Sequence, residues 1–444
     1  MKKNINKIVA IGIGLSIISG SISPVFAADN NVNTTTMQIS DVGDNSINIQ
    51  GTTQKPVLTL QKAIDAAISN SDKLSLKSKE ITMYRNKMKL QDKINDFYDS
   101  IDQKVYDFPY DKLELQEKQT DQSEEFMGDQ IANDITNKYN AIVLKGIDIN
   151  KSKRDLEIKT KDLEFMKTKI KIGMAIDNQM TDTQIQIKDL QDQIQAKENS
   201  LKNNKDYFKV LTELNLEEYT LDQNIEYKIF RIDGSIDEYL DNKIDQYLKY
   251  NDKMIDLTKD YLDDLKDDGI NKIPEDITNG AKLDNDLSHY GVLDTTDTTT
   301  SLAKNTSGGT VLDGAYAANV LKYQKYLAQL NAHGSYLDGK YSEQEGEVKL
   351  DEVKRNLKNG LKDCYSNLLA LENKINTVND QVKSTNTKLR FAKSQVDIGM
   401  MTENDYEAQV LKSEDLDTGL RTLINNYNTL IDTIQKPWII SNAQ

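Results

Sequence analysis

Few residues in this sequence are of types that carry catalysis. The only histidines are His289 and His333, and the only cysteine is Cys364. With only two histidines in the chain, we expect neither a histidine-based metal site nor a catalytic triad. No glycine-rich phosphate loop or paired-carboxylate signature stands out either. We therefore expect a protein that is not an enzyme and that holds no cofactor and no metal.

The residues with a defined spacing form the pattern Phe-x-Lys-x4-Ile-Gly-Met, which occurs at Phe165–Met174 and at Phe391–Met400. Glycine adopts the left-handed backbone conformation that ends many helices without steric cost. Gly173 and Gly399 are therefore expected to be helix C-caps. When the two glycines are aligned, the residues around them match in the same register without a gap. This predicts that one helical hairpin was duplicated.

A stripe of apolar residues at a seven-residue spacing leads into each copy of the pattern. This period predicts a long helix that packs along a coiled-coil seam against a partner helix. The first such helix is expected over Ile131–Ile172, with a length of about 63 Å. The stripes are Ile135, Ile142, Ile149, Leu156, Leu163 and Ile170 in the first copy, and Leu361, Leu368, Ile375, Val382, Leu389 and Val396 in the second.

A returning helix is expected after each glycine, because apolar residues resume a helical spacing there. The first hairpin repeat is placed at residues 58–214 and the second at 235–437. The apolar residues of the returning helices are Ile187, Ile194, Leu201 and Phe208 in the first, and Leu416, Leu420, Leu423, Tyr427, Leu430 and Ile434 in the second.

Each repeat also begins with an opening helix. Thr59 is expected to cap the first one, which would run from Leu60 to about Val105. Tyr106–Ser123, which contains Pro109, is predicted to be a turn or short irregular link. A similar opening recurs at Leu240–Met254, farther from the glycine of its repeat than the first opening is from Gly173. The second repeat therefore carries an insertion, which is placed at about 266–315.

The N-terminal residues are predicted to direct export. Residues 1–27 combine three lysines, a short apolar run and Val25-Phe26-Ala27 as a cleavage site, which is typical of a signal peptide. Residues 28–57 are expected to be a disordered arm. Removal of the three lysines makes the formal charge of −15 still more negative. A charge of this sign opposes binding to nucleic acid.

Taken in order, these features resemble the TolC-type outer-membrane efflux protein family. The residues that carry the resemblance are the Leu-Thr-Leu-x-x-Ala-Ile opening at Leu58–Ile64, the long polar helix that ends in Ile-Gly-Met, and the duplication of the unit. The resemblance implies a homotrimer that forms an α-helical tunnel in the outer membrane, or at the cell surface if the cell has no outer membrane. It also implies an adaptor protein and an inner-membrane pump as partners.

The resemblance further implies roles for residues near the glycines. The adaptor-contact tips would be Ile172, Gly173 and Met174 in the first repeat, and Ile398, Gly399 and Met400 in the second. The tunnel entrance would be narrowed by Asp405, Gln179 and Asp182. Two alternatives need no tunnel. An acid such as Asp405 is favourable at the start of a helix, and the methionines could simply pack within the tips.

The sequence departs from the family in its strands. A membrane-spanning strand needs about 9–11 residues of alternating character, and neither Tyr106–Ser123 nor the Asp- and Thr-rich insertion shows them. We therefore predict an all-α fold of long antiparallel coiled-coil hairpins in two tandem repeats, with a TolC-like tunnel and little or no β-strand. An exported structural coiled-coil protein of the cell surface, without channel activity, is the alternative function.

Overall fold

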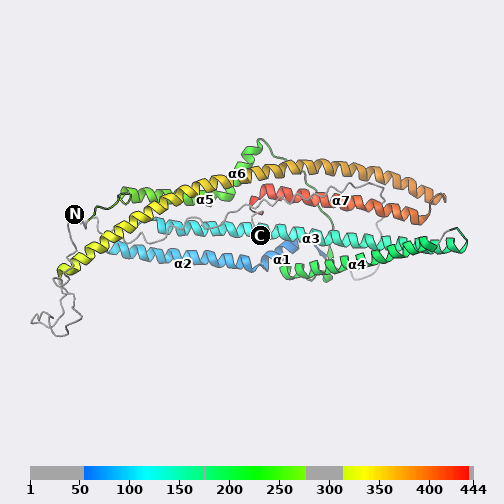
Figure 1. Cartoon of the computed structure of the whole chain (residues 1–444), viewed down its shortest axis with the longest axis horizontal. Coiled ribbons are helices and arrows are strands. Elements are labelled where there is room, and N and C mark those ends of the chain that lie inside the picture. Colours follow the sequence, from blue (N-terminus) through cyan, green and yellow to red (C-terminus); the bar gives the residue numbers. More distant parts are fainter. Residues whose placement is uncertain (1–54, 175–176, 277–313, 440–444) are drawn as a thin grey trace, which may run out of the picture. The chain divides into compact units, whose positions relative to one another are not determined.

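Long α-helices make up most of the computed structural model of this chain, which describes residues 55–174, 177–276 and 314–439 (Figure 1). The strands β1 (Val57–Leu58) and β2 (Thr220–Leu221) pair in parallel. The predicted all-α class with little β-strand is therefore confirmed. The helices of the described part are α1 (Leu60–Ser69), α2 (Asp72–Ser100), α3 (Phe108–Lys171), α4 (Asp177–Thr212), α5 (Ile236–Asp267), α6 (Gly314–Asp397) and α7 (Glu403–Gln435), with the short 3-10 helices η2 (Leu216–Glu218) and η4 (Pro437–Ile439).

Several predicted segments fall outside the described residues. These are the signal peptide at 1–27, nearly all of the arm at 28–57, and residues 277–313 of the predicted insertion at 266–315. The repeat boundaries 58–214 and 235–437 stay predictions.

The opening helix begins as predicted but does not continue to Val105. The Thr59 hydroxyl accepts a hydrogen bond from the Lys62 N–H at 3.3 Å, which confirms Thr59 as the N-cap of α1. The helix ends at Asn70, whose side-chain amide donates to the carbonyls of Val210 and Leu211, both at 3.2 Å. A second helix, α2, begins after this break. The prediction of one helix is wrong because asparagine and serine side chains satisfy the backbone groups of a helix break.

The predicted link at Tyr106–Ser123 is also wrong, because α3 begins at Phe108 and passes through it. Pro109 lies in the first turn of that helix. A proline is tolerated there, since the first N–H groups of a helix have no intrahelical partner. The connection between α2 and α3 is therefore confined to residues 101–107.

The two predicted stripes lie on the buried faces of α3 and α6. Ile135, Ile142 and Ile149 are at most 4% exposed, and Leu361, Leu368 and Ile375 are each 0% exposed. Removing a side chain of this size from water contributes roughly 1.5–3 kcal/mol. Nearer the glycines, Leu156 and Val382 are half-buried, whereas Leu389 of the second stripe is again buried, at 2% exposed.

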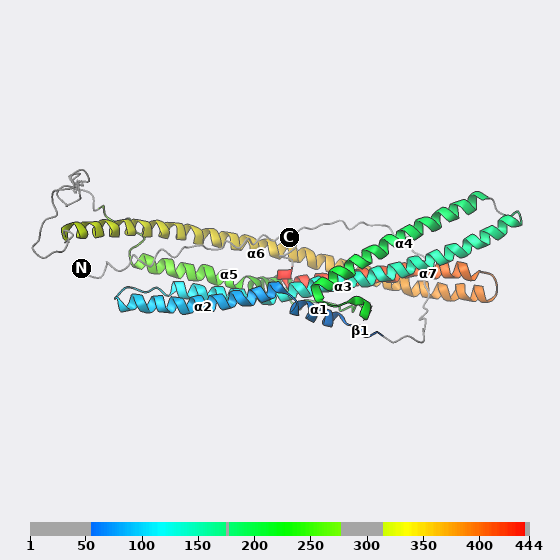
Figure 2. The same cartoon turned by 90° about the horizontal axis from the view of Figure 1, so that it is seen from below.

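The chain divides into two compact units, and α2, α3, α5 and α6 each contribute residues to both. In their described parts, unit 1 comprises residues 79–120, 248–276 and 314–353, and unit 2 comprises 55–78, 121–174, 177–247 and 354–439. In unit 2, α4 returns along α3 and α7 returns along α6, which confirms the two antiparallel hairpins (Figure 2). An ion pair between Lys153 and Glu198, at 2.7 Å, joins α3 to α4.

Polar side chains join the two hairpins of unit 2 to each other. The Asn140 amide on α3 donates to the Asn425 side-chain oxygen on α7 at 2.5 Å. Farther along the same helices, Lys151 pairs with Asp415. From the first of these pairs to the second, the residue number rises on α3 and falls on α7, so the two helices are antiparallel. Because α4 packs along α3 and α6 packs along α7, the helices of unit 2 follow the order α4, α3, α7, α6.

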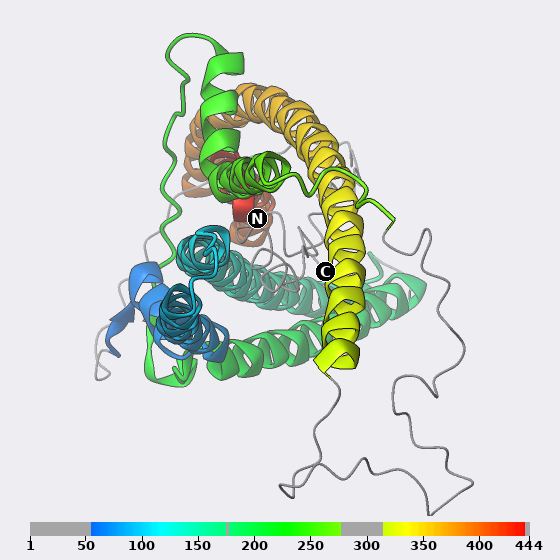
Figure 3. The same cartoon turned by 90° about the vertical axis from the view of Figure 1, so that its left-hand side faces the viewer.

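In unit 1, four helical segments follow one another in the order α2, α3, α5, α6. Arg85 on α2 pairs with Glu117 on α3 at 2.7 Å. Phe108 on α3 stacks on Tyr261 on α5, with ring centroids 4.1 Å apart. Lys259 on α5 contacts Glu347 on α6 at 3.8 Å. Figure 3 looks along these helices from one end and shows this order.

Candidate functional site: the two hairpin tips

The first hairpin tip is the end of α3. The backbone turns at Gly173, whose φ is +75°. The Gly173 N–H donates to the Ile170 carbonyl at 3.0 Å, and the Met174 N–H donates to the Lys169 carbonyl at 2.8 Å. These bonds form a Schellman motif, which pairs carbonyls that the end of a helix otherwise leaves without a donor.

The second tip repeats this geometry at the end of α6. Gly399 has a φ of +78°. Its N–H donates to the Val396 carbonyl at 2.9 Å, and the Met400 N–H donates to the Gln395 carbonyl at 2.8 Å. Both glycines are thus C-caps, as the sequence predicted. The duplication therefore extends from the sequence motif to the hydrogen bonds of the turn.

Apolar side chains beside both glycines project into solvent. Ile172, Met174, Ile398 and Met400 are between 63% and 75% exposed. The phenylalanines one heptad earlier are exposed as well. Met174 and Met400 therefore do not pack within the tips, whereas Met401 is half-buried beside Gln409. We name Phe165, Ile172 and Met174 the first tip patch, and Phe391, Ile398 and Met400 the second. Clustered exposed apolar residues are typical of interaction surfaces.

Asp405 lies in the first turn of α7 and takes part in its cap. The Thr402 hydroxyl accepts from the Asp405 N–H at 3.1 Å and donates to the Asp405 carboxylate at 2.6 Å. An acid at this end of a helix is also favoured by the helix dipole. Gln179 and Asp182 are exposed at the start of α4, on the other hairpin. The entrance role of these three residues stays a prediction.

Asn404, which the sequence did not single out, connects the two hairpins near their tips. Its amide donates to the Ile158 carbonyl at 3.3 Å and to the Asp162 carboxylate at 2.5 Å, both on α3. Lys161 pairs with Glu407 beside it at 2.9 Å. The equivalent residue in the first repeat, Asn178, is exposed. The duplication alone therefore gave no signal for this contact.

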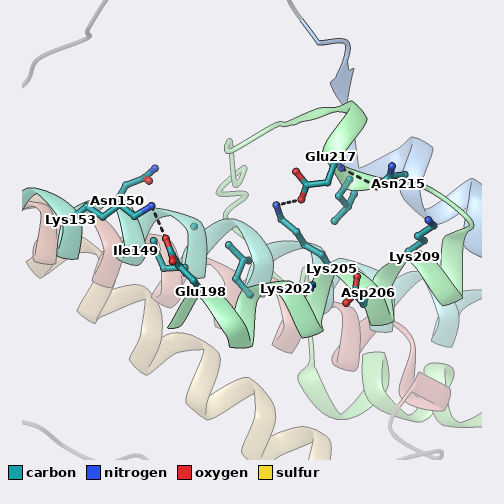
Figure 4. Close-up of a pocket in the computed structure, with 13 residues that line it drawn as sticks. Ile149, Asn150, Lys153, Glu198, Lys202, Lys205, Asp206, Lys209, Asn215 and Glu217 are labelled. Atoms are coloured by element: carbon teal, nitrogen blue, oxygen red, sulfur yellow. Dashed lines mark hydrogen bonds and ion pairs between the residues drawn. The ribbon is translucent and has the colours of Figure 1, made fainter. Parts of the chain in front are cut away.

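A lysine-rich pocket of about 570 Å³ lies on the first hairpin, between α3, α4 and η2 (Figure 4). Two ion pairs cross it, Lys153 with Glu198 at 2.7 Å and Lys205 with Glu217 at 2.8 Å. The hydrogen bond from Lys205 lowers the pKa of the Glu217 carboxyl below its ordinary value. Gly146 lines the pocket, and a Cβ added there would meet no atom within 4 Å.

His333 and Cys364 are of residue types that occur in catalytic sites, but here both lie within the helical packing. The His333 ring nitrogen Nδ1 lies 2.8 Å from the Ile270 carbonyl. Burial raises the pKa of the half-buried Cys364 thiol, and Asp363 raises it further, which disfavours the reactive thiolate. His289 lies outside the described residues.

The described residues contain neither a candidate metal cluster nor a candidate membrane-spanning helix. Within 55–174, 177–276 and 314–439, no group of three or more histidine, cysteine, aspartate or glutamate side chains could hold a metal ion. No α-helix in those same ranges is at once long and apolar enough to cross a bilayer.

The fold is that of the TolC-like outer-membrane channels, so the predicted resemblance is confirmed at the level of the fold. The chain is similar to CusC, whose crystal structures were analysed for conformational changes that accompany folding and transmembrane channel formation. The TM-score is 0.51 at 10% identity, over 86% of this chain and 91% of CusC. No protein-family model and no curated protein sequence matches the chain.

Two further solved structures are similar over most of their length. The outer membrane channel CmeC of Campylobacter jejuni has a TM-score of 0.46 at 12% identity, over 86% of each chain. The outer membrane protein VceC of Vibrio cholerae has a TM-score of 0.46 at 11% identity, over 84% of this chain and 95% of VceC.

Proposed function

We propose that this chain is a non-enzymatic, TolC-like tunnel component of an efflux or export assembly in the cell envelope. The observation that carries the proposal is the pair of helical hairpins that end in equivalent exposed apolar tips, on a fold similar to that of CusC. Three copies would form the tunnel, each contributing α3, α4, α6 and α7. The assembly would lie in the outer membrane, or at the cell surface where there is only one membrane.

The two tip patches would dock a periplasmic-type adaptor. Each patch is held by a turn of fixed geometry and offers a methionine, whose flexible thioether adapts to irregular partner surfaces. Because the two turns share the same hydrogen bonds, each copy of the chain would present two similar sites. A homotrimer would therefore present a ring of repeated docking sites to the adaptor.

Conduction through this tunnel would be passive, with the energy supplied by an inner-membrane pump that the adaptor links to it. Asn404 and Glu407 on α7 bind Asp162 and Lys161 on α3, and these contacts would hold the tip closed. Opening would separate these pairs and move Asp405, Gln179 and Asp182 away from the tunnel axis. Adaptor binding to the tip patches would favour the open arrangement if it bound that arrangement more tightly.

The experiment that tests this function places a charge in both patches. Met174→Asp with Met400→Asp should abolish co-isolation of the adaptor from native cells, since charged side chains would replace the apolar contacts. Because both methionines are exposed, helicity measured by circular dichroism should not change. Val210→Asp, at another exposed site on α4, is the matched control and should retain the adaptor. Equal recovery from both variants would remove the tip assignment.

A further inference from the structure

The lysine-rich pocket on the first hairpin contains two lysines that the chain itself does not pair. Two other lysines of the lining are bound by acids, in the ion pairs described above. Lys202 and Lys209 also line the pocket, and neither forms an ion pair with any of the described residues. The pocket therefore offers two ammonium groups to an anion from outside the chain.

These two lysines lie on one face of α4. Lys202, Lys205 and Lys209 follow one another at intervals of three and four residues, which places them on the same side of a helix (Figure 4). Lys202 and Lys209 are separated by about 10 Å along the helix axis. Both side chains are exposed, so a ligand that enters from solvent would meet them first.

Apolar side chains lie deeper in the same pocket. Ile149 on α3 and Leu216 on η2 are 4% and 5% exposed, and Leu201 on α4 is half-buried. Gly146 adds no side chain to this wall. The volume of about 570 Å³ is within the range of sites for small organic ligands, which is roughly 300–1,000 Å³. An apolar wall below a charged mouth suits a molecule with an apolar body and an acidic group.

The second repeat shows that the hairpin fold does not require lysines in these places. None of the four lysines of the pocket has a lysine at the equivalent position, 226 residues later in the chain. The equivalents of Lys153, Lys202, Lys205 and Lys209 are Asn379, Asn428, Ile431 and Gln435. The packing of a helical hairpin therefore does not explain the lysines of the first repeat.

The equivalent region of the second repeat is covered by the chain itself. Asn428, at the position of Lys202, donates to the Glu226 carbonyl at 2.8 Å. Glu372, at the position of Gly146, accepts from the Arg231 guanidinium at 2.6 Å. In the second repeat, then, an acid at this position is bound by a cation from the chain. The first repeat has the cations and a glycine in place of the acid.

We propose that this pocket binds a small organic anion with an apolar body, such as an alkyl phosphate or an alkyl carboxylate. The acidic group would accept hydrogen bonds from Lys202 and Lys209, and such charge-assisted bonds are stronger than neutral ones. The apolar body would lie on Ile149, Leu201 and Leu216. All of these residues belong to the first repeat, so the site needs no second copy of the chain and goes beyond the proposed tunnel function.

Titration calorimetry of the full mature protein with hexyl phosphate tests the site. Hexyl phosphate should bind the unmodified protein, and added salt should weaken the binding. Lys202→Gln with Lys209→Gln should lower the affinity about tenfold, because two charge-assisted hydrogen bonds are lost. Lys89→Gln with Lys93→Gln, at exposed lysines of α2, is the matched control and should leave the affinity unchanged.

Two further variants should change the affinity in opposite directions. Gly146→Glu reproduces the residue of the second repeat and should abolish binding, since its carboxylate would enter the pocket beside the lysines. Asp206→Asn removes an exposed acid from the rim and should raise the affinity about two- to fivefold. A purely structural role of the lysines would not produce this gain.

Absence of binding, or equal affinity in the pocket lysine variant and its control, would overturn the site. Inorganic phosphate that bound as tightly as hexyl phosphate would also overturn it, because the apolar wall would then have no role. Hexyl glucoside of equal affinity would do the same for the lysines. Displacement of hexyl phosphate by phosphatidylglycerol vesicles would assign the pocket to a lipid headgroup and contradict a small free anion. None of these results bears on the number of copies, so the tunnel is tested separately.

Discussion

The two hairpins agree at their tips and differ along their sides. Gly173 and Gly399 have φ values of +75° and +78°. The turns share the same two hydrogen bonds, at 3.0 and 2.8 Å in the first and at 2.9 and 2.8 Å in the second. Gly146 and Glu372 occupy equivalent positions of the aligned repeats. The glycine opens the lysine-rich pocket, whereas Glu372 is bound by Arg231 at 2.6 Å. The two repeats therefore share one tip geometry, whereas equivalent residues along their sides make different contacts.

The same contrast appears where the returning helices end. Asp206 and Asp432 are equivalent in the same alignment of the repeats. Asp206 is exposed at the rim of the pocket. Asp432 is half-buried, and burial raises the pKa of its carboxyl; the charge of Lys436 opposes this rise, and Asp129 adds a smaller increase. The surroundings of each repeat, rather than the shared sequence pattern, therefore set how far this acid is buried.

The largest expected effect tests whether the two seams are equally strong. Ile142→Ala and Leu368→Ala remove equivalent side chains that are 2% and 0% exposed, and each should cost about 2–5 kcal/mol of unfolding free energy. Urea denaturation measures both. Phe165→Ala and Phe391→Ala, at exposed equivalent positions, are the controls and should change it by less than about 0.5 kcal/mol. A large cost in only one repeat would break the equivalence of the seams.

The next effect concerns the turns. Gly173→Val and Gly399→Val should each cost about 1–2 kcal/mol, because valine is strained at a positive φ. No atom lies within 4 Å of an added Cβ at either site, so the cost is conformational rather than steric. Asparagine, which tolerates this conformation, should cost less at both positions. Thermal unfolding that leaves one valine variant unaffected would show that the two turns are not equivalent.

A smaller and opposite effect is expected at the pocket. Gly146→Ala should stabilise the protein by about 0.5–1 kcal/mol, since glycine weakens a helix interior and the site is open. Gly128→Ala, at another open site in α3, is the matched control and should give a similar gain. Loss of stability in Gly146→Ala alone, measured in urea, would indicate that the open pocket is itself required.

The smallest effect is pH-dependent. Because the folded pKa of Asp432 is raised, the folded chain holds this proton more tightly, and ionisation destabilises it as pH rises through the folded pKa. Asp432→Asn should therefore stabilise the protein at neutral pH, and the gain should vanish below the ordinary aspartate pKa. Asp206→Asn, at the exposed equivalent, should change stability little at any pH. Equal pH profiles for the two variants would remove the contrast.

The sequence predicted features that depend on a local rule. The seven-residue stripes located α3 and α6, and the duplicated glycines located both turns, because apolar periodicity and a positive φ leave direct signals. Contacts that depend on tertiary surroundings left none. Asn70 breaks the opening helix by bonding to carbonyls on α4, and Asn404 joins the hairpins although its counterpart Asn178 is exposed. Pro109 led to the wrong prediction of a link, because proline disrupts the interior of a helix but is tolerated in its first turn.

The central claim is that copies of this chain close into a three-copy tunnel. The most direct test is the native mass of the mature protein, measured by light scattering across a range of concentrations, with and without detergent. The account predicts a mass of three copies that persists on dilution. A monomer or dimer at every concentration would contradict it and would favour a structural coiled-coil protein of the cell surface.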